Sequence, residues 1–527
     1  MLDSDENDTS LRTAAVMNRA QFLRLFGGAA ALGVMAGSFG FVAPALAAEG
    51  GELIVGISSD VKTLDPQMSP LDVFRHTIRS TVFEALVFIN PETLKADPML
   101  AASWETSADG LTWTFKLPPG VTWHNGTPFT ANDVVYSIKR VQDKSTGSPF
   151  SPQLVAISKA EAPDAATVVL TLANTVPGLL ANLAVIQIVN EASIGSITTA
   201  PVGTGPFKFT EWAPGDHIRV EKYDGYHRAG LPKLAAIEWR IVPDSQARLA
   251  GLQDGTLQMV ALVEGKDVVQ ARSVAGIEVI QTKPYVLYEN FNINTTRAPF
   301  NDKRVRQALA YAFDRDAYTK TIWFGLARPT INPVPPEMAT YLPGSSDRYG
   351  FDLDKAAALL KAAGFDKDKP LTMEILTPTG FDSLKSMALV LQDNLNRIGH
   401  KVTVRDMEVT VWIERILTKP DYDVTTNNYN TGPEDPASMF NSPNLAPAAN
   451  VSLWNPPGYA ELVAKAAKEI DPVQQVALYQ QLQTLILEEM PQITIDHLPL
   501  FFLGSSDAGK ALVIGPSGID DYTAISV

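Results

Sequence analysis

The segment Thr372–Arg405, TMEILTPTGFDSLKSMALVLQDNLNRIGHKVTVR, decides the fold class. Its two ends, Thr372–Leu376 and Val402–Arg405, have the alternation of apolar and polar side chains that is typical of strands. Between them, Ser383–Ile398 repeats apolar residues with a period near 3.6, which predicts an amphipathic helix ending at Gly399. A strand, a helix and a second strand in this order indicate an α/β unit.

The same alternation of helices and strands continues on both sides of this unit. Further helices are expected to begin at Asp302, at Asp352 or Asp354, and at Asp471-Pro472; the second ends at Gly364, the third before Pro491, and a strand covers Tyr422–Thr426. The first half of the chain is richer in strands, which are expected at Glu52–Ile57, Leu111–Leu117, Thr167–Leu172, Phe207–Trp212, Ile218–Lys222 and Ile237–Val242. Because the sequence has no low-complexity linker, we expect the domains to be joined by strands that pass between them, as in hinged proteins.

The composition excludes several classes of function. The chain has 527 residues, of which 45% are apolar, as in folded proteins, and this length allows about three domains. With 43 Lys and Arg against 58 Asp and Glu, the formal charge is −15; this charge repels phosphate backbones, so nucleic acid is not an expected partner. The sequence has no cysteine, which excludes thiol nucleophiles, disulfides and Cys-ligated metals.

Residues 1–48 are typical of a secretory signal peptide. An uncharged run, Leu25–Ala48, follows Arg19 and Arg24 and ends in the small-residue pattern Ala45-Leu46-Ala47. A membrane anchor is the alternative, but the run is rich in Ala and Gly and only weakly hydrophobic. We therefore expect cleavage near residue 47 or 48 and a periplasmic location for the mature chain.

The export route and the start of translation are less clearly marked. Asn18–Arg24 is similar to the twin-arginine export motif, but Ala20 occupies the position of the second arginine. Acidic residues are unusual before a signal peptide, and because four of them precede Met17, this methionine is a candidate start: Asp3, Asp5, Glu6 and Asp8.

Motifs for catalysis or metal binding are missing from the sequence. The six histidines, His76, His124, His217, His227, His400 and His497, include no pair at the i, i+4 spacing of two ligands on one helix face. Gly203–Phe207 lacks the Lys and the third Gly of a phosphate loop, so we expect a turn there. No nucleophile is paired with a base, and Asp314 and Asp316 fit a solvated helix surface. We therefore expect no enzyme, no cofactor and no metal site.

One stretch has the composition of a ligand-binding edge. The predicted strand Tyr422–Thr426 runs into Asn427–Gly432, which supplies amides, a hydroxyl and one aromatic ring. Such side chains at the C-terminal end of a strand can hydrogen-bond a polar ligand. An ordinary polar surface loop has the same composition, and the residue types alone do not decide between the two. His124, in the turn-rich stretch Trp123–Pro128, is expected to be a hydrogen-bonded structural residue.

Landmarks along nearly the whole mature chain carry a family resemblance. They are Thr63–Pro66, Phe83–Val87, Leu100–Trp104, Asp109–Phe115, Val121–Val134 (VTWHNGTPFTANDV), Val202–Phe207, Phe300–Leu309 and Ala362–Phe365. In these segments the chain resembles the extracytoplasmic solute-binding proteins of ABC transporters of the peptide/nickel class, the dipeptide- and oligopeptide-binding type. Most of the segments look like turns, caps and packing positions, so they indicate the family more than the ligand.

The resemblance implies an α/β, two-lobed periplasmic-binding-protein fold with an extra domain inserted in the first lobe. Carried onto this chain, lobe I comprises about 49–80, 200–288 and 492–527, the inserted domain 81–199, and lobe II 289–491. The crossing segments are expected near Tyr285–Asn294 and Pro491–His497. In such a fold a ligand that touches both lobes gains its second set of contacts when the lobes close.

The sequence departs from the family pattern at one position. Peptide-binding members usually have a Trp and then an Asp after the lobe II strand, and this Asp pairs with the α-amino group of the peptide. Aligned on Asp435-Pro436, the Trp position is Tyr429 and the Asp position is Gly432. A buried ammonium without a counter-charge is strongly unfavourable. Either Glu434 or its neighbour Asp435 substitutes, or the ligand has no free amine, as in an opine, a sugar or a modified peptide.

The leading hypothesis is a binding protein that captures a small polar solute, a peptide or peptide-like compound, and delivers it to an ABC permease. The ligand-binding residues that we expect are Tyr429 as a stacking wall, Asn428, Asn430 and Thr431 as a hydrogen-bonding edge, and Ser58 and Ser59 from lobe I. The protein is expected to be a monomer whose partners are the solute and the permease subunits. Alternatives are the same role for a non-peptide solute such as an opine, sugar or metal chelate, an extracytoplasmic hydrolase, and a sensor adaptor or chaperone on the same scaffold.

Overall fold

The chain forms three sheets of four or more strands, in a computed structural model that describes residues 50–69, 75–176, 178–282, 287–430, 436–440, 442, 444–447, 450–505, 508, 512–514 and 520–526. All of these lie in the compact unit Ala47–Val527. The unit Met1–Leu46, which holds most of the predicted signal peptide, lies outside the described residues. Within the described part, every helix is too short or too polar to span a bilayer.

The seven-stranded sheet comes mainly from the N-terminal half. Its strand order is β12-β19-β11-β1-β10-β9-β8, with bounds Ile277–Gln281, Phe501–Ser505, Met259–Val260, Glu52–Ile57, Ala236–Ile241, His217–Lys222 and Phe207–Ala213. β1 is parallel to β10 and β11, and the other neighbours are antiparallel. Helices α5 (Ser245–Asp254) and α6 (Gly265–Ala271) follow β10 and β11 in the chain. Leu53, Val55 and Ile57 of β1 are buried in one core, as the alternation predicts.

The six-stranded sheet contains the segment that decides the fold class. Its order is β14-β18-β13-β17-β15-β16, with bounds Arg328–Pro329, Gln492–Leu498, Leu287–Ile293, Val424–Asn430, Thr372–Pro378 and Lys401–Met407. β15 is parallel to β16 and β17, and the helix between β15 and β16 confirms the predicted α/β unit. The helices are α7 (Lys303–Tyr311), α8 (Arg315–Ile322), α9 (Leu353–Ala362), α10 (Asp382–Arg397), α11 (Val409–Ile413) with the π-helical η4 (Glu414–Thr418), α12 (Pro436–Phe440), α13 (Tyr459–Lys468) and α14 (Pro472–Glu489).

Three predicted helix starts are confirmed by side-chain caps. Asp302, Asp352 and Asp471 each accept a hydrogen bond from a backbone N–H in the first turn of α7, α9 and α14. Such bonds satisfy the otherwise unpaired N–H groups at a helix start. Of the two alternatives for α9, Asp352 is the cap and Asp354 lies in the first turn.

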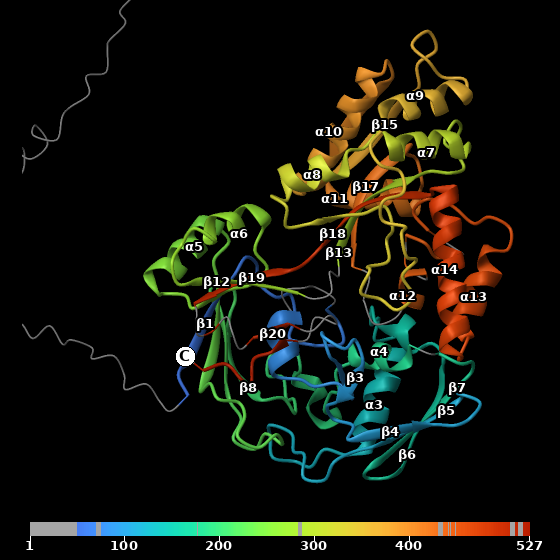
Figure 1. Cartoon of the computed structure of the whole chain (residues 1–527). Helices are drawn as coiled ribbons and strands as arrows, with labels where there is room; N and C mark the ends of the chain where they lie inside the picture. The colour runs from blue at the N-terminus through green and yellow to red at the C-terminus, as the bar shows by residue number, and fades with distance from the viewer. Residues whose placement is uncertain are drawn as a thin grey trace, which may run out of the picture. The chain divides into compact units, whose positions relative to one another are not determined.

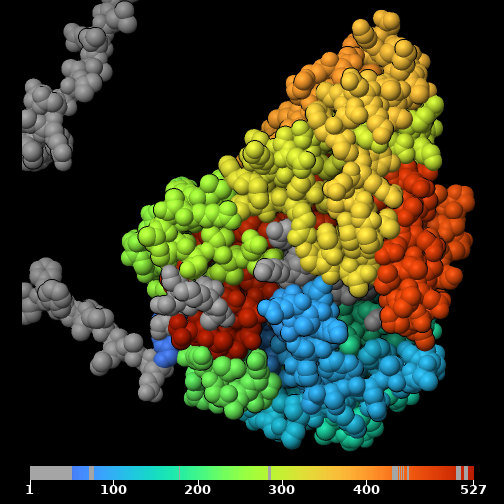
Figure 2. All heavy atoms as spheres, viewed as in Figure 1, coloured from blue at the N-terminus to red at the C-terminus, as the bar shows by residue number. Residues whose placement is uncertain are grey.

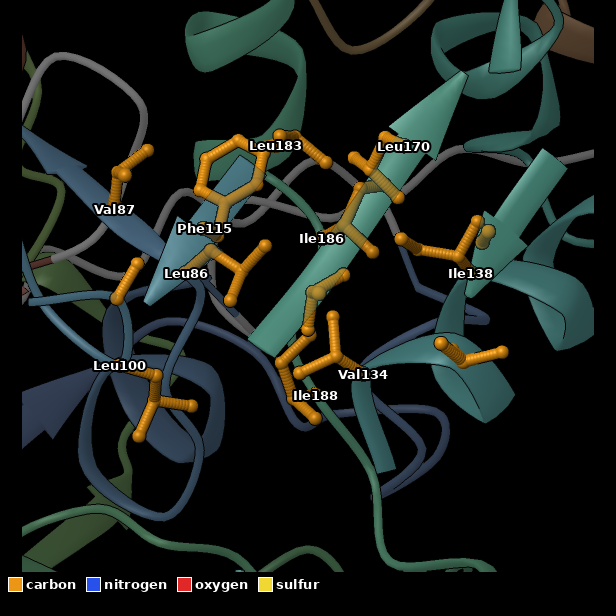
Figure 3. Packing of buried hydrophobic residues seen from close by; sticks show 14 of the residues in the cluster. Leu86, Val87, Leu100, Phe115, Val134, Ile138, Leu170, Leu183, Ile186 and Ile188 are labelled. Atoms are coloured by element: carbon orange, nitrogen blue, oxygen red, sulfur yellow. The ribbon is translucent and has the colours of Figure 1, made fainter. Parts of the chain in front are cut away.

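The four-stranded sheet lies between β1 and β8 in the sequence. Its order is β4-β5-β7-β6, with bounds Ser103–Thr106, Thr112–Lys116, Thr167–Leu172 and Ile157–Asp164. Helices α3 (Ala131–Gln142) and α4 (Leu179–Ala184) share its core, where Phe115, Leu170, Val134 and Leu183 are buried (Figure 3). The short elements are β2 (Val87–Ile89), β3 (Ala96–Pro98), β20 (Val513–Ile514), β21 (Asp520–Asp521), η1 (Arg75–Arg79), η2 (Ser151–Leu154) and η3 (Glu191–Ser196).

Two neighbouring segments connect the seven-stranded and six-stranded sheets. β12 and β19 pair in the first sheet, and their continuations β13 and β18 pair in the second (Figure 1). Between the two ladders, Thr282 N–H donates to the Leu500 carbonyl over 3.0 Å, and Leu500 N–H donates to Thr282 Oγ1 over 2.8 Å. At the crossing, the described residues Thr282 and Leu500 therefore hold the two segments together by hydrogen bonds.

The structure corrects one prediction. The strand expected at Tyr422–Thr426 is β17, Val424–Asn430, so Asn427–Asn430 are strand residues and do not form a loop. Their register partners are Asn290, Glu289, Tyr288 and Leu287 of β13, in that order. The neighbouring strand provides a backbone ladder for these residues, which outweighs the low strand propensity of asparagine.

The predicted turn at Gly203–Pro206 packs against another backbone segment. A Cβ at Gly203 would lie 1.7 Å from the Val82 carbonyl oxygen, and one at Gly205 would lie 2.4 Å from that of Thr81. His124 ties this turn in place, since its Nε2 lies 2.9 Å from the Gly205 carbonyl and its Nδ1 accepts from Gly203 N–H over 3.3 Å. Burial lowers the pKa of His124 to about 4. The predicted structural role of this histidine is confirmed.

Candidate functional site

Tyr429 lies on β17 beside Tyr288 of β13. The two residues are register partners, and their ring centroids are 6.1 Å apart with an interplanar angle of 51°. Tyr288 is fully buried, whereas Tyr429 is half-buried. Burial raises the pKa of both phenols, so both stay neutral near pH 7. The pair offers a partly exposed aromatic surface that could stack with a ligand.

Polar side chains from the segment after α12 hold this aromatic pair. Asn444 Nδ2 donates to the Tyr288 hydroxyl over 3.0 Å, and Asn427 Nδ2 lies 3.4 Å from Asn444 Oδ1. A hydrogen bond with Ser442 lowers the pKa of Tyr429 against the larger effect of burial. Tyr288, Ser442 and Asn444 were not predicted, because no local pattern connects them with Tyr429.

The predicted residue Asn428 does not share the aromatic face. Side chains alternate along a strand, so Asn428 points to the face opposite Tyr429. Asn428 is exposed and lies in register with Glu289, while the structure describes only the backbone of Asn430. Thr431, Gly432, Glu434 and Asp435 lie outside the described residues.

Ser58 and Ser59 belong to the other sheet. Both are exposed and follow the end of β1, as predicted. The next residue, Asp60, accepts hydrogen bonds from Trp212 Nε1 over 3.0 Å and from Gly215 N–H over 2.8 Å, which fixes the turn after them. Within the described ranges, no hydrogen bond joins either serine to β17. The structure thus brings Tyr429 together with unpredicted partners and leaves the serines on a separate element.

A buried layer of amides continues the face of Tyr288 along the crossing strands. Asn290 Nδ2 donates to Asn292 Oδ1 over 3.0 Å, and Asn292 Nδ2 donates to Ser452 Oγ over 3.3 Å. Ser452 Oγ donates in turn to the Pro491 carbonyl over 2.8 Å. Buried hydrogen-bond networks of this kind favour one arrangement of the strands that carry them. The alternation of Asn290 and Asn292 with Phe291 is the sequence signal that could have identified this layer.

A metal site and a titrating histidine find no support among the described residues around these strands. The described residues contain no group of three or more His, Asp or Glu side chains able to hold a metal ion. His497 of β18 is fully buried, and its Nε2 lies 3.1 Å from the Pro333 carbonyl oxygen. Burial lowers the pKa of His497 to about 4, so this histidine is neutral near pH 7.

A cavity of about 560 Å³ lies apart from the aromatic pair. Its walls come from eight residues between positions 80 and 102, from Pro118, Pro206 and residues 226–228, and from Asp520, Asp521 and Thr523. Glu84 is buried in this wall, where its carboxylate accepts from the Tyr226 hydroxyl over 3.1 Å and lies 3.0 Å from His227 Nε2. None of the predicted ligand-binding residues contributes to the cavity.

A family model and one curated relative match most of the chain. The model of the bacterial extracellular solute-binding proteins, family 5 Middle, matches residues 95–450. The glutathione-binding protein GsiB of Escherichia coli O1:K1 / APEC is 29% identical over 462 residues, which cover 84% of this chain and 88% of GsiB.

Solved structures match over a similar extent. CtaP, an ABC transporter substrate-binding protein from Listeria monocytogenes, aligns with a TM-score of 0.82 at 24% identity, covering 91% of this chain and 100% of CtaP. The PBP AgaA from A.tumefacien R10, in complex with agropinic acid, aligns with a TM-score of 0.74 at 26% identity, covering 90% of this chain and 98% of AgaA. The predicted fold class is confirmed by these alignments.

Proposed function

Because the chain belongs to the bacterial extracellular solute-binding proteins of family 5, we propose that it captures a small polar solute and delivers it to an ABC importer. The observation that carries this proposal is the pair of crossing strands. Two sheets with separate cores are joined by β12–β13 and β18–β19, which bond to each other at Thr282 and Leu500. Bending at two neighbouring strands lets two bodies approach while each core stays intact.

We assign the two bodies as predicted from the sequence. Lobe I comprises about 49–80, 200–288 and 492–527, the inserted domain 81–199, and lobe II 289–491. A solute that contacts both lobes favours the closed state by the free energy of its second set of contacts. Moving the closed fraction from 1:99 to 99:1 takes a preference of about 5.5 kcal/mol, which a few buried hydrogen bonds and an aromatic contact can supply.

The proposed binding residues are Tyr429, held by Tyr288 and Asn444, together with Asn428, Asn430 and Thr431 from lobe II and Ser58 and Ser59 from lobe I. The support is strongest for Tyr429, whose ring is partly exposed while its neighbours are fixed by hydrogen bonds. Ser58 and Ser59 are exposed at the end of a central strand, a common position for ligand contacts in α/β sheets.

A peptide-like solute is the first candidate ligand. GsiB, named for glutathione, supports a peptide, and AgaA, solved with agropinic acid, supports an opine as the second candidate. Gly432 stands where peptide-binding relatives usually have an Asp for the α-amino group, which favours a solute without a free amine unless Glu434 or Asp435 replaces that Asp.

We further propose a periplasmic, monomeric protein that works with permease subunits and alters no bond in its solute. The family description as extracellular proteins and the signal-peptide pattern of residues 1–48 support this location. The sequence pairs no nucleophile with a base, which supports binding without catalysis.

The decisive experiment identifies the solute and measures closure. Native mass spectrometry of the mature chain shows what co-purifies, and titration with glutathione and with agropinic acid follows. We expect one of these classes to raise the melting temperature and to contract the protein in solution scattering. A bound solute that leaves the scattering unchanged contradicts closure, and accumulation of a hydrolysed product supports an enzyme instead.

A variant pair tests the site. Tyr429→Ala should weaken solute binding about fivefold or more, since it removes an aromatic contact that is typically worth ~1 kcal/mol or more. Asn174→Ala is the matched control, because Asn174 is an exposed residue near the four-stranded sheet that bonds only to the adjacent backbone. Equal affinities of the two variants would exclude Tyr429 from the site.

A further inference from the structure

Two carboxyl groups meet in the interior where the chain crosses between the sheets. Glu289 of β13 and Asp496 of β18 are register partners, and each is at most 1% exposed. Glu289 N–H donates to Asp496 Oδ1 over 3.2 Å. Burial raises the pKa of both carboxyls, because an interior of low polarity disfavours the charged form. Repulsion by Glu289 is the second cause of the raised pKa of Asp496, so ionising both carboxyls is costly.

The surroundings of the two carboxyls differ. The Tyr318 hydroxyl lies 2.7 Å from Glu289 Oε2, and Trp323 Nε1 donates to the same oxygen over 3.0 Å. Two donors on one oxygen stabilise a negative charge on Glu289. Asp496 accepts a single backbone N–H, and its carboxyl also shares a side-chain hydrogen bond with the carboxyl of Glu289, which favours the charged form of Glu289 and the neutral form of Asp496. This asymmetry favours the anion on Glu289 and the proton on Asp496.

Among the described residues, no ion pair involves Glu289 or Asp496. The negative charge of these two carboxyls is therefore not offset by a neighbouring cation. Arg328, in the strand next to β18, pairs with Glu337 over 2.7 Å, and Lys266 pairs with Glu264 over 2.9 Å. The charged and titratable groups on the surrounding elements include Tyr288 on β13, Tyr429 on β17, His497 on β18, Arg328 on β14, Arg315, Asp316, Tyr318 and Lys320 on α8 with its cap Asp314, Asp382, Lys385, Asp393 and Arg397 on α10, and Glu264, Lys266 and Asp267 at α6. A shared proton is therefore what neutralises the second carboxyl.

Trp323 connects the acid pair with the other sheet. A Cβ at Gly265, the first residue of α6, would lie 3.2 Å from Trp323 Cε3, so this glycine packs directly on the indole ring. Leu326, three residues further on, is buried in a cluster with Val268 and Phe501 of the seven-stranded side. Figure 2 shows the lime-green surface of residues 245–271 adjoining the yellow-green surface of the region around α8. The donor to Glu289 thus also contacts the body across the hinge.

We propose that Glu289 and Asp496 form a proton-dependent lock on the crossing strands. With one proton between them, the pair holds β13 to β18 and fixes Trp323; without it, two adjacent carboxylates repel and the hinge loosens. The folded chain retains a proton that the unfolded chain releases, since its carboxyl pKa values are raised. The stabilisation is therefore complete below the ordinary carboxyl pKa and is lost as the pH rises through the folded-state pKa. The inference rests on the proposed function only in treating the crossing strands as a hinge.

The test uses the mature chain without solute. Asp496→Asn mimics the protonated Asp and cannot ionise. Asp133→Asn is the matched control, because Asp133 of α3 also has a pKa raised by burial but is a half-buried residue in the first turn of a helix that packs on the four-stranded sheet. Infrared spectroscopy near pH 7 reports protonated carboxyls. Hydrogen exchange of 287–293 and 492–498, corrected for the intrinsic pH dependence of exchange, reports how tightly the strands are held.

We expect the infrared band of a protonated carboxyl in the wild type and in Asp133→Asn, and its loss in Asp496→Asn. Corrected exchange of the two strands should rise about tenfold or more as the pH is raised through the titration of this band, and should stay nearly constant in Asp496→Asn. If that variant does not fold, Glu289→Gln must give the same loss of pH dependence. An unchanged band in Asp496→Asn, or equal pH dependence in all chains, overturns the lock. Because no solute is involved, failure of the proposed transport role would not alter these readings.

Discussion

The hydrogen bond from Asn444 Nδ2 to the Tyr288 hydroxyl provides a quantitative test of how the aromatic pair is held. It spans 3.0 Å and joins residues 156 positions apart, both of them buried. Tyr288→Phe removes the acceptor and leaves the amide donor of Asn444 unsatisfied. A buried unsatisfied donor costs about 1–3 kcal/mol, so the free energy of unfolding should fall by about that amount.

A double-mutant cycle isolates the bond. Asn444→Ala should also lower the free energy of unfolding, since it removes the same bond and the longer contact from Asn427. Because the shared bond can be lost only once, the double variant should be more stable than the sum of the single effects predicts, by about 1 kcal/mol. Urea unfolding with an unchanged slope measures each value.

The control and the solute titration complete this test. Tyr311→Phe also deletes a phenolic hydroxyl, one for which the structure records no hydrogen bond among the described residues, and should change stability by less than ~0.5 kcal/mol. Affinity for the identified solute should fall about fivefold or more in Tyr288→Phe. The hydrogen bond that this variant loses, worth ~1 kcal/mol, fixes the ring beside Tyr429, and without it the ring of Tyr429 is held less firmly. Strictly additive losses in the cycle, or a neutral Tyr288→Phe, would refute the reasoning.

Three further predictions concern the scaffold. Gly203→Ala should destabilise the chain by more than ~3 kcal/mol, because its Cβ would lie 1.7 Å from the Val82 carbonyl oxygen; a melting temperature equal to that of the wild type would contradict this. Asp352→Ala should lower the unfolding free energy by about 0.5–2 kcal/mol through loss of the cap on α9, whereas Asp352→Asn, which can still cap, serves as the control in urea unfolding. Burial lowers the folded-state pKa of His497 to about 4, below its ordinary value of 6.5, so the unfolded chain binds more protons between these values and stability falls as the pH drops from about 6.5 to 4. His497→Gln removes this titration and should flatten the acid limb of a pH series by about 3 kcal/mol, and an unchanged acid limb would show that His497 is not buried neutral.

Much of the fold follows from local patterns. β1 and β7 coincide residue for residue with the strands predicted from alternation, since one face of each is buried. The helix starts at Asp302 and Asp471 were predicted because a cap is a contact between residues two or three positions apart. Where the interaction that decides the structure is local, the sequence is sufficient.

The features that the sequence did not predict depend on contacts between residues far apart in the chain. β17 extends to Asn430 because β13 provides hydrogen-bond partners for it, although asparagines in sequence resemble a loop. The same partnership places Asn428 and Tyr429 on opposite faces, which the composition of the stretch does not reveal. Ser442 and Asn444, which hold the tyrosine pair, come from a segment that has no periodicity in common with either strand.

The buried polar residues of the crossing strands β13 and β18 were not predicted from the sequence. In a sequence, Asn290, Asn292 and Asp496 are interruptions in apolar strands, which would ordinarily favour an exposed edge. In the structure they are buried in β13 and β18, where the chain crosses between the two sheets, so each polar group needs a hydrogen-bond partner in the interior. A strand that only completed a core would be more stable with apolar residues at these positions. Under the proposed hinge, the hydrogen bonds of Asn290 and Asp496 hold β13 to β18 while the bodies on either side move.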